Sequence, residues 1–131
     1  MRSRVILAED DDAVGSRLCA LLSSEFEVVA AVSDGAAALE KATELRPDFV
    51  LLDIVMPGMD GFAAARALRL SMPSVPVIFV TRRCDRAYVE EAFAAGGSGY
   101  VLKGSAAVEL SAALREVWSG RRYLSARLRV A

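Results

Sequence analysis

Short apolar runs alternate with longer amphipathic stretches along the whole chain. Five apolar runs predict buried strands at residues 4–9, 27–32, 48–52, 75–80 and 99–102. Between them, apolar residues recur at helical spacing and predict helices at about 12–22, 35–45, 62–72, 86–95 and 105–118. Apolar runs without alternation are typical of parallel strands covered on both faces. The pattern predicts an α/β fold: a doubly wound five-stranded parallel sheet with five helices.

Capping residues and turn signals give the helix ends. Asp12 is expected to cap the first helix, and Gly96 with Gly97 to close the fourth. The last helix is expected to carry Val108 and Trp118 on its apolar face. These signals agree with the helix lengths that the apolar spacing predicts.

The order of the strands decides which side chains meet. Five parallel strands in the flavodoxin-like order 2-1-3-4-5 place the first strand beside the third, where the direction of winding reverses. Ligands of such sheets bind outside the carboxyl ends of the strands at that point. We therefore expect a functional site among the residues that follow the first and third strands.

Polar and charged side chains stand at the ends of four apolar runs. Glu9 and Asp10 follow the first run, Asp53 follows the third, and Thr81 and Lys103 follow the last two. Taken singly, each has an ordinary explanation: a solvated loop start, a β-branched strand residue or an exposed lysine. Their joint placement favours one acidic site that accepts a phosphoryl group.

The expected cluster of Glu9, Asp10 and Asp53 needs positive charge. Carboxylates about 5 Å apart repel by about 3 kcal/mol per pair at an effective dielectric constant near 20. Oxygen ligands with open positions favour Mg²⁺. Asp53 is the candidate nucleophile, because a carboxylate forms an acyl phosphate. Thr81 and Lys103 are candidate donors to the transferred oxygens.

Composition narrows the function further. The chain has 131 residues, enough for one domain, and its net charge of −1 and aromatic content of 7% give no footprint for nucleic acid binding. It has no histidine, which excludes a Ser-His-Asp triad, a histidine metal ligand and a phosphohistidine donor within this sequence. A phosphoryl group carried by histidine must come from another protein.

The cellular compartment follows from the apolar runs and the cysteines. Charged residues interrupt the apolar runs well before about 20 residues, the length that spans a membrane. The first run ends at Glu9 and three aspartates, so no signal peptide is expected. Cys19 and Cys84 lack metal or redox spacing and are expected to be reduced thiols. We expect a soluble cytoplasmic protein.

Four segments carry the motifs on which the function depends. They are Val5-Ile6-Leu7-Ala8-Glu9-Asp10-Asp11, Leu51 to Gly61, Val80-Thr81 and Gly99 to Lys103. Together they resemble the receiver domain of bacterial two-component response regulators, over nearly the whole chain. The resemblance implies that Asp53 accepts phosphate from a sensor histidine kinase. It also implies that Glu9, Asp10 and Asp53 hold Mg²⁺. Val55 is implied as a further metal ligand through its main-chain carbonyl.

The same resemblance implies how the site signals. Thr81 and Lys103 contact the phosphoryl group, and Tyr100 matches the family's switch aromatic, which turns inward as Thr81 moves toward the phosphate. New charge-assisted bonds then shift a population between two states. A tyrosine that packs at a strand edge is the alternative for Tyr100.

The end of the chain bears on the output. Residues 117–125 resemble the stretch that leads from the receiver to a helix-turn-helix domain in the NarL/LuxR-type subfamily. We therefore expect a receiver domain at 1–120 and a linker at 121–131, toward a DNA-binding domain absent from this chain. Regulation of transcription, DNA contact only through that domain and a homodimer on phosphorylation are then expected. A stand-alone receiver that keeps the linker is the other interpretation.

Three residues depart from the family's pattern. Arg82 follows Thr81 where a small residue is usual, so it either overhangs the phosphate or points outward into solvent. Gly104 replaces a common proline after Lys103, which favours a trans bond there. Gly97 stands where alanine is usual and can loosen the loop before the fifth strand.

Other function classes compete with a phosphorylated switch. A pseudo-receiver that acts only as a protein-interaction module keeps the fold without the chemistry. A phosphatase of the haloacid dehalogenase type needs a second acid two residues after the nucleophile, where Val55 stands. A flavodoxin-like redox protein needs a phosphate loop that does not follow the first run. We therefore expect a regulatory domain, not an enzyme, with self-catalysed phosphotransfer and dephosphorylation only.

Overall fold

A single parallel sheet organises the molecule, which a computed structural model describes over residues 2–129. Its strands are β1 (Arg4–Ala8), β2 (Glu27–Val32), β3 (Phe49–Leu52), β4 (Val77–Thr81), β5 (Gly99–Leu102) and β6 (Tyr123–Leu124). The α-helices are α1 (Asp12–Leu22), α2 (Gly35–Leu45), α3 (Gly61–Ser71), α4 (Arg86–Ala94) and α5 (Ala106–Trp118). Two short 3₁₀ helices, η1 (Lys103–Ser105) and η2 (Ala126–Leu128), follow β5 and β6.

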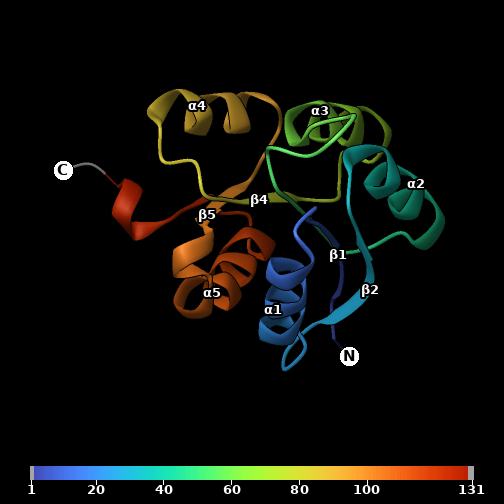
Figure 1. Ribbon diagram of the computed structural model, residues 1–131, viewed down its shortest axis with the longest axis horizontal. Helices are drawn as coiled ribbons and strands as arrows, with labels where there is room; N and C mark the ends of the chain where they lie inside the picture. The colour runs from blue at the N-terminus through green and yellow to red at the C-terminus, as the bar shows by residue number, and fades with distance from the viewer. Residues whose placement is uncertain (1, 130–131) are drawn as a thin grey trace.

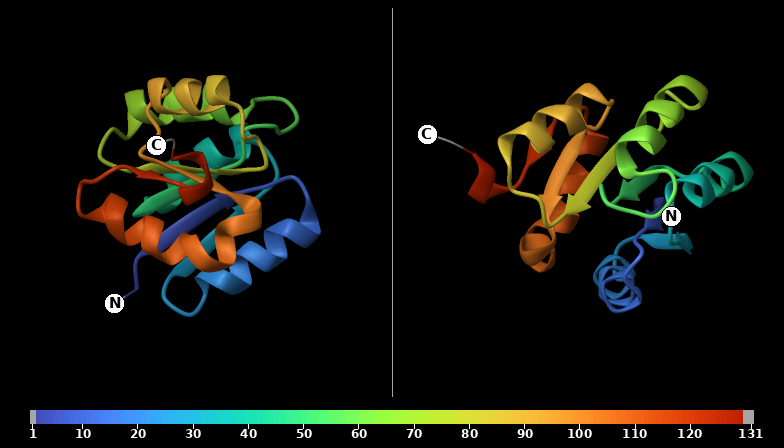
Figure 2. Two further views of the ribbon diagram at one scale, coloured as in Figure 1. Left: turned by 90° about the vertical axis from the view of Figure 1, so that its left-hand side faces the viewer. Right: turned by 45° about the horizontal axis from the view of Figure 1, so that its top comes forward.

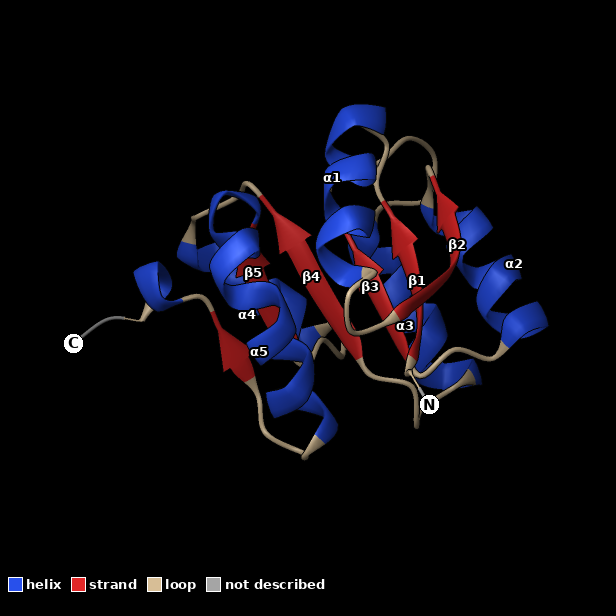
Figure 3. Ribbon diagram, turned by 90° about the horizontal axis from the view of Figure 1, so that it is seen from below, coloured by secondary structure: helices blue, strands red, loops and turns tan. Residues whose placement is uncertain are grey.

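The strand order is β2-β1-β3-β4-β5-β6, and every pair is parallel. The predicted order 2-1-3-4-5 is therefore confirmed, and Figure 3 shows these strands side by side. The prediction of five strands was one short. Tyr123 and Leu124 add a sixth strand beside Gly99 and Tyr100 of β5. A run of two residues is too short to show a strand period in the sequence.

Helices cover both faces of the sheet, as predicted. In Figure 1, α2, α3 and α4 lie above the sheet, while α1 and α5 lie below it. Successive strand residues point to opposite faces, so Ile6 and Ala8 pack on the first side and Val5 and Leu7 on the second. All five positions of β4 and all four of β3 are buried. Two apolar layers thus hold the strand ends in fixed positions.

Aspartate side chains cap three of the helices through a hydrogen bond. The carboxylate of Asp11 accepts a hydrogen bond from the Val14 amide at 3.1 Å, so Asp11 caps α1, and the prediction of Asp12 was wrong by one residue. Asp34 and Asp60 cap α2 and α3 in the same way. Each such cap contributes about 1 kcal/mol. Because α1 and α3 follow loops that begin at strand ends, the caps also shape the edge where polar residues gather.

Two residues expected on the buried face of the last helix are exposed to solvent. Val108 is 87% exposed and Trp118 is 62% exposed, although the Trp118 ring lies 5.5 Å from that of Phe49. Leu110 and Leu114 are buried as expected. The apolar face of α5 is thus narrower than the sequence pattern indicated.

The segment after α5 returns to the sheet. Residues 121–129 add β6 and η2 along the outer edge of β5, whereas residues 130–131, the end of the expected linker, lie outside the described residues. Figure 2 shows this last segment, in red, beside β5. Cys19 and Cys84 are both free thiols, as predicted. Within residues 2–129, no helix is long and apolar enough to cross a bilayer.

Candidate functional site

The carboxyl ends of the central strands bring the predicted acidic residues together. Residues Ala8 and Leu52 are paired across β1 and β3, so Glu9 and Asp53 leave the sheet side by side. The amide of Asp53 donates to the Ala8 carbonyl at 3.1 Å, and the amide of Glu9 donates to the Val32 carbonyl at 2.9 Å. Main-chain bonds thus fix the positions from which both carboxylates project.

Glu9, Asp10 and Asp53 form one carboxylate cluster. Oxygen atoms of the three side chains lie within 4.8 Å of one another. Glu9 and Asp53 are buried, whereas Asp10 is exposed. The cluster lies in a cleft of about 490 Å³, lined by Glu9, Asp10, Asp11, Asp53, Val55, Thr81, Arg82, Arg83 and Lys103. Every predicted site residue except Tyr100 therefore lines one cleft.

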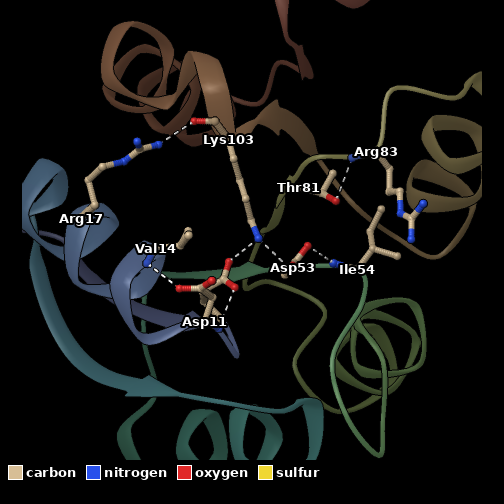
Figure 4. A network of polar contacts seen from close by, with 9 residues as sticks. Asp11, Val14, Arg17, Asp53, Ile54, Thr81, Arg83 and Lys103 are labelled. Carbon is tan, nitrogen blue, oxygen red and sulfur yellow. Dashed lines mark hydrogen bonds and ion pairs between the residues drawn. The ribbon is translucent and has the colours of Figure 1, made fainter.

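Lys103 places a buried ammonium against the cluster. Its Nζ lies 2.7 Å from Oε1 of Glu9 and 2.8 Å from Oδ2 of Asp53. Figure 4 shows the Lys103 side chain extending toward Asp53 from the segment that follows β5. A buried charge is tolerated only when it is paired, which explains why this lysine is 4% exposed. One ammonium against three carboxylates leaves the site with a net negative charge.

One oxygen of the cluster lacks a hydrogen bond. Glu9 Oε1 is buried and accepts none, although it lies close to the Lys103 ammonium, so that contact is an ion pair only. Oε2 of the same carboxylate accepts the Asp11 amide at 3.1 Å. A buried carboxylate oxygen with a free lone pair, beside two further acidic side chains, fits a hard divalent cation such as Mg²⁺.

The loop after β3 wraps closely around Asp53. Oδ1 of Asp53 accepts the Ile54 amide at 2.7 Å, and the Gly61 amide donates to the Ile54 carbonyl at 2.8 Å. A Cβ atom on Gly61 would lie 2.1 Å from the main-chain oxygen of Asp53. Only glycine allows this approach, which explains the glycine that begins α3. Val55, expected to contribute its carbonyl, lies in this loop and lines the cleft.

Thr81 occupies the last position of β4, opposite Leu102 of β5. It is 1% exposed, and its Oγ1 accepts the Arg83 amide at 3.3 Å. The hydroxyl uses its oxygen in that bond, so its proton is free to be donated to another oxygen in the cleft. Thr81 and Lys103 therefore both bring donor groups to the cleft that holds Asp53.

Tyr100 lies inside the molecule and does not face the cleft. Its ring is buried in the apolar layer on one face of the sheet, and its hydroxyl donates to the Arg83 carbonyl at 2.8 Å. Burial, followed by the nearby Cys84 and Asp85, raises the pKa of this phenol, so it stays a neutral donor. The Tyr100 side chain thus points inward and is hydrogen-bonded to the loop that follows Thr81. Because β6 lies beyond it, Tyr100 does not pack at the sheet edge.

Three arginines surround the site. Arg82 and Arg83 are exposed and line the cleft, and the Arg83 guanidinium lies 5.3 Å from the centre of the Tyr88 ring. Arg17 of α1 donates to the main-chain carbonyl of Lys103 at 3.1 Å. Sequence reasoning missed Arg17, because 86 residues separate the two partners and no motif marks the pair. The peptide bond after Lys103 is trans, as expected.

The arrangement is suited to phosphoryl transfer. The Asp53 carboxylate shares the cleft with a hydroxyl and an ammonium from the ends of two neighbouring strands, and with two further carboxylates of the kind that can hold a metal ion. Transfer of a phosphoryl group needs positioning and charge stabilisation more than covalent chemistry from the protein.

Comparison with known proteins gives the same picture. The sequence pattern described as the response regulator receiver domain matches residues 5–115. The response regulator GacA of Pseudomonas viridiflava is 36% identical over 124 residues, which make up 93% of this chain and 58% of GacA. The transcriptional regulatory protein LnrK of Bacillus subtilis is 40% identical over 119 residues, 89% of this chain and 54% of LnrK. The chain therefore spans little more than half the length of these relatives.

Solved structures agree over almost the whole chain. A two-component response regulator of the LuxR family from Aurantimonas superposes with a TM-score of 0.92 at 31% identity, covering 98% of this chain and 93% of that one. The signal receiver domain of the putative response regulator NarL from Mycobacterium tuberculosis gives a TM-score of 0.87 at 34% identity, with 92% and 98% covered.

Proposed function

The chain belongs to the response regulator receiver domain family, and from that premise we propose that it is the phosphorylated switch of a two-component system. Asp53 accepts a phosphoryl group from a phosphohistidine of a sensor histidine kinase. The observation that carries this proposal is the buried Asp53 carboxylate, 2.8 Å from the Lys103 ammonium and within one acidic cluster. Acceptor, donor and metal-ligand types meet in one cleft.

The transfer step uses the side chains already in place. A carboxylate oxygen of Asp53 forms a bond to phosphorus while the bond from phosphorus to the kinase imidazole nitrogen breaks. The electron pair stays with the imidazole, and the product is an acyl phosphate. The Lys103 ammonium and the Thr81 hydroxyl donate to the oxygens that gain charge, which is the main source of stabilisation.

A metal ion completes the charge balance. Glu9, Asp10 and Asp53 would hold Mg²⁺ through carboxylate oxygens, and Val55 would contribute its main-chain carbonyl. When bound, Mg²⁺ supplies the positive charge that a phosphoryl group requires beside three carboxylates. The unbonded Oε1 of Glu9 supports this assignment.

Phosphorylation changes a conformational population. The Thr81 hydroxyl moves from the Arg83 amide to a phosphoryl oxygen, and the Arg83 carbonyl is tied to Tyr100. Thr81 and Tyr100 form a two-state element because both contact the same loop. The domain is regulatory, and its chemistry is limited to its own phosphotransfer and dephosphorylation.

The output we propose is transcription. GacA and LnrK are regulatory proteins about twice the matched length, which supports residues 1–120 as the receiver and 121–131 as the connection to a C-terminal helix-turn-helix domain. DNA is contacted only by that domain, phosphorylation favours a homodimer, and the protein works in the cytoplasm. A stand-alone receiver acting through protein contacts is the second candidate.

Phosphate uptake by Asp53 tests the proposal. The wild-type chain is incubated with Mg²⁺ and acetyl phosphate or a histidine kinase, and phosphoprotein is measured by intact mass. We expect one added phosphoryl group that Asp53→Asn abolishes, while Asp85→Asn, at an exposed aspartate without a capping bond, keeps it. Phosphorylation of Asp53→Asn would reject the assignment of the acceptor. A wild-type chain that takes up no phosphate and does not respond to beryllofluoride would identify a pseudo-receiver.

A further inference from the structure

The segment after α5 is held by a buried carboxylate that the phosphoryl site does not use. Glu109 of α5 is 8% exposed, and both of its oxygens bond to residues 121–129, the tail segment. The Ser125 hydroxyl donates to Oε1, and the Ala126 amide donates to Oε2 at 2.8 Å. A carboxylate enclosed in this way needs both partners, since a buried charge without hydrogen bonds is costly.

Ser125 joins the tail segment to β5 as well as to α5. Its side chain is fully buried, and its Oγ accepts the Leu102 amide at 2.8 Å. Its own amide donates to the Tyr100 carbonyl at 2.9 Å. Ser125 thus makes two hydrogen bonds to the main chain of β5, and its hydroxyl donates a third to Glu109.

These contacts lie one residue away from the phosphoryl site. Leu102 directly precedes Lys103, whose ammonium contacts Asp53. Tyr100 is bonded at both ends: its hydroxyl reaches the loop after Thr81, and its carbonyl reaches Ser125. The tail segment, in red in Figure 1, is therefore connected to the cleft by its hydrogen bonds to β5 and by the main chain that leads from Leu102 to Lys103.

We propose that Glu109 and Ser125 are positioning residues that couple docking of the tail segment to the phosphoryl site through β5. This inference rests on the proposed function of the site. Docking holds the Leu102 amide and the Tyr100 carbonyl, and so holds Lys103 toward Asp53 and Tyr100 inward. Energetic coupling between two sites is reciprocal, so a phosphoryl group on Asp53 tightens the tail segment by the same factor.

The structure also gives the direction of the coupling. The docked tail segment occurs together with inward Tyr100 and with Lys103 against Asp53, the arrangement that the phosphoryl group requires. A docked tail segment therefore raises the affinity of the site, and a loosened one lowers it. Phosphorylation of Asp53 is thereby transmitted to the tail segment as tighter docking.

Binding of Mg²⁺ with beryllofluoride, a phosphoryl mimic, tests the coupling in the 131-residue chain. Ser125→Ala and Glu109→Gln are compared with Ser119→Ala and Glu40→Gln, which alter exposed side chains outside the tail segment. Calorimetric titration gives the affinity, and hydrogen exchange measures protection of residues 121–129. We expect binding to be weaker by about fivefold or more for the first pair, the low end of typical coupling. The controls are expected to match the wild type.

The wild type provides a second measurement that requires no substitution. Beryllofluoride with Mg²⁺ should slow exchange of residues 121–129 by at least the factor by which Ser125→Ala weakens binding, since the variant loses at most the full coupling. Unchanged exchange in the wild type, or unchanged affinity in folded variants whose tail segment exchanges faster, would overturn the coupling. A wild type that does not bind the mimic would instead contradict the proposed function of the site.

Discussion

The ammonium of Lys103 lies 2.8 Å from the carboxylate of Asp53, and both side chains are more than nine-tenths buried. Glu9 stands on the other side of the same ammonium at 2.7 Å. A buried cation thus holds two buried anions in place, and the acceptor of the phosphoryl group is also a structural partner. Stability and chemistry are therefore coupled at this point.

Removing the buried ammonium should destabilise the fold. Lys103→Met leaves Glu9 and Asp53 buried without a cation, which typically costs about 3–5 kcal/mol. Mg²⁺ should restore more stability to this variant than to the wild type, because it supplies the missing charge. Urea unfolding with and without Mg²⁺ measures both effects. Lys41→Met, at an exposed pair with Glu44, is the control and should change stability by less than about 1 kcal/mol. An equally stable Lys103→Met protein would contradict the prediction.

Replacing Asp10 should lower the affinity for Mg²⁺ without lowering the stability of the fold. It belongs to the carboxylate cluster but is exposed, so Asp10→Asn removes a charged ligand without uncovering a buried partner. We expect Mg²⁺ affinity to fall about tenfold or more, equivalent to about 1.4 kcal/mol. Unfolding in the absence of metal should stay the same or become slightly harder, since repulsion is relieved. Calorimetry and urea titration separate the two, and unaltered Mg²⁺ affinity would exclude Asp10 as a ligand.

Gly61 and Gly104 should respond oppositely to alanine. At Gly61 a Cβ meets the Asp53 carbonyl at 2.1 Å, whereas nothing lies within 4 Å of a Cβ at Gly104. Gly61→Ala should cost more than about 2 kcal/mol and impair phosphorylation, since the loop around Asp53 must move. Gly104→Ala should be neutral or stabilising by up to about 1 kcal/mol. Thermal unfolding decides, and equal effects at the two glycines would contradict the close approach of α3 to the Asp53 carbonyl.

Glu109 should make stability depend on acid pH. Burial opposes its charged form, but the Ala126 amide and the Ser125 hydroxyl outweigh burial and hold the pKa of Glu109 below its usual range. Its contribution is therefore complete above the unfolded pKa, about 4.3, and is lost as the pH falls through the folded value. The stability difference between wild type and Glu109→Gln should shrink as the pH falls below that range. Urea midpoints between neutral and acid pH measure it, and a constant difference would oppose the assignment.

Arg82 should attract anionic donors to the cleft. It is exposed and lines the cleft that holds Asp53, so its charge is screened by salt. Arg82→Ala should slow phosphorylation by acetyl phosphate by about threefold or more at low ionic strength, and the difference should vanish at high salt. Arg2→Ala, which removes the same charge from an exposed arginine at the start of the chain, is the control. A salt-independent effect would indicate a steric role.

Most of the site could be predicted because it depends on strand ends. Glu9, Asp53, Thr81 and Lys103 end or directly follow apolar runs, and the sheet order brings such positions together whatever the loops do. The contact between Arg17 and Lys103 had no comparable signal, because it joins two distant segments through one exposed side chain. Tertiary partners of this kind leave no local pattern.

The errors at the end of the chain have a physical reason. Tyr123 and Leu124 are too few to show a strand period, and their place beside β5 is decided by Ser125 and Glu109, which lie 16 residues apart. The exposure of Val108 has a different reason: helical spacing gives the direction of an apolar face but not its width. Polar residues that look like a linker can thus carry the contacts that close a sheet.

The short β6 strand has a consequence for solubility. A free strand edge is a template on which a second chain can add its own strand, and this is a common route to aggregation. In this protein Tyr123, Leu124 and Ser125 already occupy the outer edge of β5. While β6 is in place, β5 is not open to such pairing, and the outer strands of the sheet are β6, of two residues, and β2. Proteolytic loss of these residues would expose the edge of β5 and favour aggregation by strand pairing between chains.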